Sequence, residues 1–259
     1  MRQGVAAIRN PLAAKRERPG LVIELTGVTT SRSDLVAEAI RNAILSGDLK
    51  PDELLVERQL AQLLGVSKTP VREALILLAS TGLVTTSRNR GVTVRRLTSV
   101  DEVRHIYEER VLLEPWALGS AIRRGQSLDF TEAAQLVDEA QSLANKGESA
   151  VLAMTNRRFH RVMYSKCENP LIVRALDNLQ DLTALAIVSV LWEQWPTWRK
   201  EADEHDEILK AAEAGQADEA ERLMRTHIER SIARLGEVAG SGNEVLGPVA
   251  TNSGRTPIG

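Results

Sequence analysis

Apolar residues recur at intervals of three and four along most of the chain, and this spacing predicts a mainly α-helical protein. The first part of the chain divides into three short helices, which we expect at about 34–46, at 57–64 and from Ser67 to Gly82. Ser33 and Ser67 are the expected N-caps of the first and third helices. After Gly82 the apolar period changes to two, which predicts two strands at 83–86 and 92–97 joined by a hairpin at 87–91.

Only helical spacing returns after residue 98. Six helices are expected, at about 99–124, 128–146, 149–167, 169–191, 194–214 and 216–236. The pattern therefore predicts an N-terminal winged helix-turn-helix unit over 31–97 and a C-terminal all-helical bundle over 98–236. Residues 1–30 and 237–259 show no period and contain proline and glycine, so we expect mobile tails there.

The net charge of the whole chain hides a difference between its two parts. The net charge of −2 by itself argues against a nucleic-acid binder, because such domains are often strongly basic. However, residues 1–97 hold 15 lysines and arginines against 9 acidic residues, whereas residues 98–259 hold 18 against 26. A basic unit joined to an acidic one favours contact with nucleic acid by the first unit.

The remaining composition excludes several classes of protein. Hydrophobic residues make up 43% of the chain, which excludes wholesale disorder. The single cysteine, Cys167, cannot form an internal disulfide. No apolar run reaches the roughly 18–20 residues of a membrane span, and no apolar core follows the basic N-terminus as in a secretory signal. We therefore expect a cytoplasmic protein with no membrane partner.

Several cations lie where a winged helix-turn-helix meets DNA. Lys68, Thr69 and Arg72 begin the third helix, whose first turn reaches base edges and phosphates in the major groove. Arg58 begins the second helix, and Arg90 lies on the wing beside Arg88. The alternative is that each cation is ordinary solvated surface.

Three further charged residues are expected to have no part in this surface. Glu57 and Glu73 are expected to face away from the DNA side, where they limit the local excess of positive charge. Arg41 is expected to pair with Glu38 or Glu73.

The stretch from Leu60 to Leu75 (LAQLLGVSKTPVREAL), with SGDLKP at 46–51 and NRG at 89–91, resembles the signature of GntR-family bacterial transcription regulators. The resemblance covers residues 33–97 and implies a homodimer that binds a double-stranded DNA operator. It implies the following operator-contacting positions: Arg58, Ser67, Lys68, Thr69, Arg72, Arg90 and Gly91. The family usually has arginine in place of Lys68, and lysine makes the bidentate guanine contact less well, so a phosphate role is left open.

The histidines suggest a second site. Asn156 and His160 are four residues apart and therefore share one face of a helix, while His205 and His227 lie on two later helices. Three imidazoles and an oxygen donor from three helices can form a metal site in a bundle core. The alternative is that each is a surface or hydrogen-bonded histidine, because no compact ligand motif is present. His105 has no partner pattern and is expected to have no such role.

Residues 99–236 are similar to the FCD domain, the helical ligand-binding domain of the FadR-type subgroup. The similarity lies in Asn156-x-x-Phe159-His160, Asn169-Pro170-Leu171, His205-x-x-Ile208-Leu209 and His227. Six helices rather than seven resemble the VanR-type branch. The resemblance implies that Asn156, His160, His205 and His227 bind a divalent metal, with zinc expected and nickel or another ion as the alternative. Aspartate often occupies the first of these positions in the family, so Asn156 removes one negative charge.

The resemblance also places Arg110 at the ligand cavity. A guanidinium beside a metal would pair with a small carboxylate effector through charge-assisted hydrogen bonds. The alternative is a salt bridge on the helix surface, such as one between Arg110 and Glu114.

Three functions compete. The leading prediction is a repressor whose operator affinity is controlled by a small organic acid bound beside the metal. In the second, the metal ion itself is the signal. The third is a metal-dependent hydrolase with Glu204 or Glu207 as general base, which we disfavour because no motif places either beside a metal-bound water. We therefore expect that the protein is not an enzyme.

Overall fold

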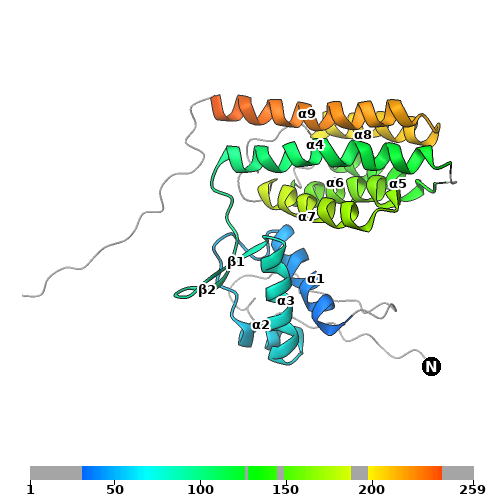
Figure 1. Ribbon diagram of the computed structural model, residues 1–259. Coiled ribbons are helices and arrows are strands. Elements are labelled where there is room, and N and C mark those ends of the chain that lie inside the picture. The colour runs from blue at the N-terminus through cyan, green and yellow to red at the C-terminus, as the bar shows by residue number, and fades with distance from the viewer. Residues whose placement is uncertain (1–30, 126–127, 145–148, 188–197, 241–259) are drawn as a thin grey trace, which may run out of the picture.

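The computed structural model describes residues 31–125, 128–144, 149–187 and 198–240, which form two units (Figure 1). The tail expected at 1–30 and residues 241–259 of the tail expected at 237–259 lie outside the described residues, whereas residues 237–240 are helical, so the prediction of a mobile tail was wrong there. The same holds for three of the expected helix ends, those at 145–146, at 188–191 and at 194–197. No helix of the described residues is both long enough and apolar enough to cross a membrane.

The N-terminal unit has the predicted winged helix-turn-helix order. Its elements are α1 (Arg32–Leu45), α2 (Glu57–Leu64), α3 (Lys68–Ser80), β1 (Val84–Ser87) and β2 (Gly91–Val94). The two strands pair antiparallel, with Val84 opposite Val94 and Ser87 opposite Gly91. Gly65 adopts the left-handed conformation after α2, with φ of 64°, and so allows the tight turn into α3.

The start of α1 differs from the prediction. Ser31, not Ser33, is the N-cap: its hydroxyl accepts a hydrogen bond from the Asp34 backbone N–H at 3.1 Å. The Asp34 carboxylate in turn accepts one from the Ser31 N–H at 3.2 Å. This reciprocal capping box needs a side-chain acceptor three residues after the cap. Ser31 has Asp34 there, whereas Ser33 has Val36, so the prediction of Ser33 was wrong.

The C-terminal unit contains the six expected helices in its described residues. They are α4 (Val100–Arg123), α5 (Thr131–Leu143), α6 (Ser149–Tyr164), α7 (Pro170–Ala186), α8 (Trp198–Glu213) and α9 (Ala217–Gly240). A 3-10 turn at Ser165–Cys167 replaces the expected end of α6, and α9 continues beyond the expected end at residue 236.

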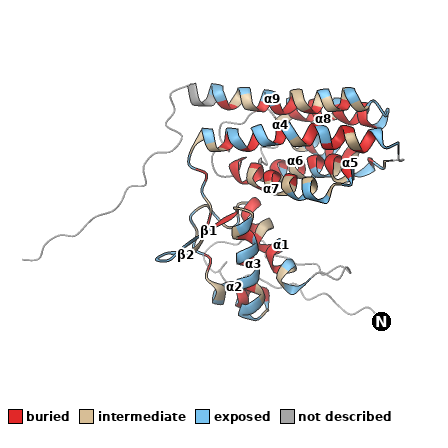
Figure 2. Ribbon diagram, viewed as in Figure 1, coloured by how far each residue is buried: buried red, intermediate tan, exposed pale blue. Residues whose placement is uncertain are grey.

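The six helices pack with their buried faces toward one another and their exposed faces outward (Figure 2). α4 packs against α9 and α7, while α5 packs against α6 and α8. The core is mostly aliphatic, including Leu118, Met163 and Leu176. Ionisable side chains are buried in the same bundle, which is uncommon unless they have partners. They include Arg110, Glu114, His160, His205 and His227.

We expect Leu78→Ala to destabilise the N-terminal unit by about 2–5 kcal/mol, because it leaves a cavity in the core that α3 shares with α1. Leu78 is 0% exposed, whereas Ile76 on the same helix is 64% exposed. The control Ile76→Ala should change the free energy of unfolding by less than about 0.5 kcal/mol. Urea unfolding followed by circular dichroism is the measurement, since all four tryptophans lie after residue 115. If both variants changed the free energy of unfolding equally, the placement of Leu78 in the core would be contradicted.

Candidate metal centre

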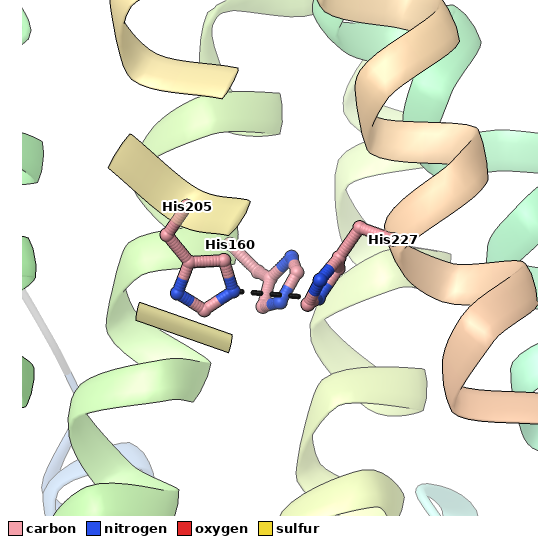
Figure 3. A group of neighbouring side chains, drawn as sticks. All are labelled: His160, His205 and His227. Atoms are coloured by element: carbon pink, nitrogen blue, oxygen red, sulfur yellow. Dashed lines mark hydrogen bonds between the residues drawn. The ribbon is translucent and has the colours of Figure 1, made fainter. Parts of the chain in front are cut away.

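Three histidines from three helices meet in the core of the C-terminal unit (Figure 3). His160 comes from α6, His205 from α8 and His227 from α9, and all three are buried. One ring nitrogen of each lies within 4.8 Å of those of the other two, so the group could hold a metal ion. The Nε2 atoms of His205 and His227 are 3.3 Å apart. By contrast, His105 is exposed on α4.

Two buried carboxylates orient two of these rings. Glu114 of α4 is hydrogen-bonded to Nδ1 of His160, and Oε2 of Glu204 lies 2.6 Å from Nδ1 of His227. A carboxylate at Nδ1 favours the tautomer in which Nδ1 carries the proton and donates it. The lone pair is then on Nε2, the nitrogen that is available to a metal. The ring of His205 is instead held by Phe159, which stacks on it at a centroid distance of 4.1 Å.

Burial favours the neutral form of the His160 and His205 rings. Burial lowers the pKa of His160 to about 4, although Glu114 opposes this effect. Burial also lowers the pKa of His205 well below its usual value, and the neighbouring His227 adds to the shift. Burial would raise the pKa of Glu114, but its interactions with His160 and Arg110, which include a hydrogen bond to each, outweigh this effect and bring that pKa down to about 2. Neutral imidazole is the form that binds a metal.

Arg110 lies inside the bundle, with its side chain directed to Glu114. Its Nε donates to Oε2 of Glu114 at 3.1 Å, and its Nη1 donates to the Thr183 hydroxyl at 3.4 Å. Gln180 of α7 also donates to the same Oε2, at 3.1 Å. The alternative of a surface salt bridge was therefore right about the partner, Glu114, and wrong about the surface, because both side chains are buried.

Some polar atoms of this centre have no hydrogen-bond partner among the described residues. They are Oδ1 of Asn156, Nη2 of Arg110, Nε2 of His160 and Oε1 of Gln180. Asn156 and His205 also border a cavity of about 10 Å³. Buried polar atoms are nearly always hydrogen-bonded, so a group of orphaned ones is typical of a site that a metal or a polar ligand completes.

Part of this arrangement was not predicted from the sequence. Gln180 and Thr183 were not considered, and Glu204 was considered only as a catalytic base. A signal was present: polar residues interrupt the apolar face of α7 between Leu176 and Ala184, and a buried face with polar interruptions often lines a site.

The predicted DNA-contacting residues are all exposed and lie on α2, the start of α3 and the hairpin. They are Arg58, Ser67, Lys68, Thr69, Arg72, Arg90 and Gly91.

Arg72 donates from Nε and Nη2 to the two carboxylate oxygens of Glu57, both at 2.9 Å. These hydrogen bonds lower the pKa of Glu57. The expectation that Glu57 faces away was wrong, because the first turns of α2 and α3 lie close enough for this pair.

Arg41 forms the expected ion pair with Glu38. It also has a partner that was not expected, Asp181 of α7 in the C-terminal unit.

Comparisons with known proteins agree with this two-unit structure. The model of the bacterial regulatory proteins of the gntR family matches residues 32–94, and the FCD domain model matches residues 105–230. An uncharacterized HTH-type transcriptional regulator from the TAR-I ttuE-ttuC' intergenic region of Agrobacterium vitis is 32% identical over 161 residues. That match covers 58% of this chain and 91% of the relative.

An uncharacterized HTH-type transcriptional regulator of Bacillus subtilis, YdhC, is 30% identical over 144 residues. This match covers 55% of the chain and 64% of YdhC, so the chain spans less than two thirds of that relative's length. The solved structure of Escherichia coli McbR/YncC has the same fold, with a TM-score of 0.70 at 24% identity over 82% of this chain and all of that one. From its two domain matches and its relatives, the chain belongs to the gntR family of bacterial regulatory proteins and carries an FCD domain after its winged helix-turn-helix unit.

Proposed function

We propose that the protein is a homodimeric transcriptional repressor whose N-terminal unit binds a DNA operator and whose FCD domain binds a metal and a small organic acid. The observation that carries the sensing part is the buried centre of His160, His205 and His227, bordered by orphaned polar atoms. Membership of the gntR family supports the DNA-binding part. A two-fold dimer would place two α3 helices on two half-sites about one helical turn apart.

The operator contacts would come from the start of α3 and from the wing. Lys68, Thr69 and Arg72 stand exposed at the N-terminal end of α3, where unpaired backbone N–H groups also favour a phosphate. Glu57 holds the Arg72 guanidinium by two parallel hydrogen bonds, which restricts its orientation before DNA arrives. Arg58 and Arg90 flank this surface from α2 and the hairpin.

The metal ligands would be His160, His205 and His227, with Asn156 as the fourth through its orphaned Oδ1. The proposed ion is zinc, with nickel or another divalent ion as the alternative. Three neutral imidazoles and a neutral amide leave the charge of a divalent ion uncompensated, and such an ion supplies a strong attraction for an anionic oxygen.

The effector would be a small carboxylate. Arg110 has one nitrogen, Nη2, that is buried without a partner and could donate to such a group. Its other contacts, to Glu114 and Thr183, hold the guanidinium in place. The cavity beside Asn156 and His205 has a volume of only about 10 Å³ and is not lined by Arg110, so side chains must move before even a small acid can reach both the histidines and Arg110.

A second candidate is a regulator for which the ion itself is the signal. The small size of that cavity favours it, because an ion alone could bind the orphaned Oδ1 of Asn156 and Nε2 of His160. The acid-sensing form predicts that chelation leaves DNA affinity unchanged and abolishes the response to the acid. The metal-sensing form predicts that chelation alone changes DNA affinity. Fluorescence anisotropy with a labelled operator, before and after chelation, distinguishes them.

The purified protein should bind about one divalent ion per chain, measured by elemental mass spectrometry. We expect His205→Ala to lose the ion and the matched control His105→Ala, on the exposed face of α4, to retain it. Glu204→Gln, which removes the charge that orients His227, should weaken metal affinity by about 10–100-fold in a chelator competition. Retention of the ion by His205→Ala would exclude this site.

Arg72→Ala should weaken binding to an operator selected from random DNA, by roughly 5–150-fold, which corresponds to about 1–3 kcal/mol for a lost base contact. Arg124→Ala is the control, because Arg124 is an exposed cation of the FCD domain that pairs with Glu168. Anisotropy at one fixed salt concentration is the measurement, since every cation contributes to salt-dependent affinity. If Arg72→Ala binds as tightly as the wild type, the recognition surface is misassigned.

A further inference from the structure

The two units meet where α1 packs against α6 and α7, and one carboxylate is buried at this contact (Figure 1). Asp181 of α7 is only 2% exposed. Its Oδ2 lies 2.9 Å from Nε of Arg41, which belongs to α1 in the N-terminal unit. Its Oδ1 accepts a hydrogen bond of 2.5 Å from Nε of Arg157, which belongs to α6. The carboxylate of Asp181 therefore contacts an arginine of each unit, one from α1 and one from α6.

A buried carboxylate depends strongly on its partners. Removing one partner of a buried ion pair leaves an uncompensated charge away from water, which is costly. The side chains of Arg41 and Arg157 are themselves largely buried, so water replaces neither of them easily. Burial raises the pKa of Asp181 and the charges of Arg157 and Arg41 oppose this rise, so the loss of either arginine disfavours the charged carboxylate.

α6 also carries His160 of the three-histidine centre, and α7 carries a residue that supports His160 indirectly. On α6, Arg157 directly follows Asn156 and comes one turn before His160. On α7, Asp181 directly follows Gln180, which donates to Glu114, the carboxylate that orients His160. A shift of α6 or α7 on filling the centre would therefore displace Arg157 or Asp181 as well.

The contact between the two units lies beside open space, which leaves room for such a displacement. A cleft of about 670 Å³ lies between the units, lined by residues of α1, the end of α3, α6 and α7. Tightly packed interiors resist movement, whereas an open cleft does not. Because a cleft separates the units here, the ion contacts of Asp181 are a specific restraint on the position of α1.

We propose that Asp181 is a positioning residue that couples occupancy of the three-histidine centre to the placement of the DNA-binding unit, through Arg41. This inference rests on the metal-sensing form of the proposed function, because it requires that occupancy of the centre by the ion itself change the affinity for DNA. It adds the route by which one site affects the other: α6 and α7 to Asp181, and Asp181 to α1.

The test compares the operator affinity of zinc-loaded full-length protein with that of chelator-stripped protein, for the wild type and three variants. Coupling between two sites usually changes affinity by about 5–150-fold, and we expect a ratio in this range for the wild type. Asp181→Asn should reduce the ratio to within about twofold of one, because the amide removes the charge that holds both arginines. Arg41→Gln, which changes the other unit, should do the same.

Asp177→Asn is the matched control. Asp177 lies one turn before Asp181 on α7 and borders the same cleft, but its partners, Arg161 and Tyr164, belong to the C-terminal unit. This variant should keep the wild-type ratio. If Asp181→Asn and Arg41→Gln also keep it, or if zinc leaves the operator affinity of the wild type unchanged, the inference is overturned. Failure of the wild type to bind zinc or any operator would instead overturn the proposed function.

Amide hydrogen exchange gives a readout that does not depend on DNA. In zinc-loaded protein, peptides from α1 (32–45) should exchange faster in Asp181→Asn than in Asp177→Asn, because α1 loses its restraint. Peptides from α9 should exchange equally in both variants, which shows that the bundle remains folded. Unchanged exchange in α1 would contradict the role of Asp181, even if the DNA affinity had changed for another reason.

Discussion

The buried charge of Glu114 constrains the whole C-terminal unit. An ionised carboxylate in a bundle core is costly unless each oxygen has a partner. Glu114 obtains its partners from three helices: Arg110 from its own α4, His160 from α6 and Gln180 from α7. Because these contacts require the three helices to lie at one relative height, they determine where His160 stands. They also direct the free nitrogen of that ring toward His205 and His227.

The helical unit therefore combines an aliphatic core with a polar centre, and the two contribute differently. Aliphatic side chains such as Leu118 and Met163 supply most of the free energy of burial, which is non-directional. The polar centre supplies direction, since each hydrogen bond tolerates only a narrow geometry. At the contact between the units, beside an open cleft, Asp181 accepts a directional hydrogen bond from Arg157 and forms an ion pair with Arg41.

Much of the fold and part of the site could be predicted from the sequence, because helical period, strand period and turn residues are local signals. The winged order of α1, α2, α3 and the hairpin follows from them, as does the sharing of one helix face by Asn156 and His160. Most contacts that the sequence did not predict join residues that are far apart in the chain. The pairing of Glu57 with Arg72 depends on how α2 crosses α3, and a period does not report a crossing angle. The cap of α1 was missed for a local reason, because two serines competed and only Ser31 has an acidic residue three positions later.

The sequence by itself determined the two-unit organisation, the basic and acidic division and the three histidines that are candidates for one site. The first two depend on residue type and local spacing, whereas the grouping of the histidines rests on the resemblance to the FCD pattern. Only the tertiary structure decided which histidine nitrogens converge, that Arg110 and Glu114 form a buried pair rather than a surface one, and that Arg41 reaches Asp181 across the joint. These depend on the rotation and height of helices that are far apart in the chain. Those quantities are set by packing and by the need to pair every buried charge.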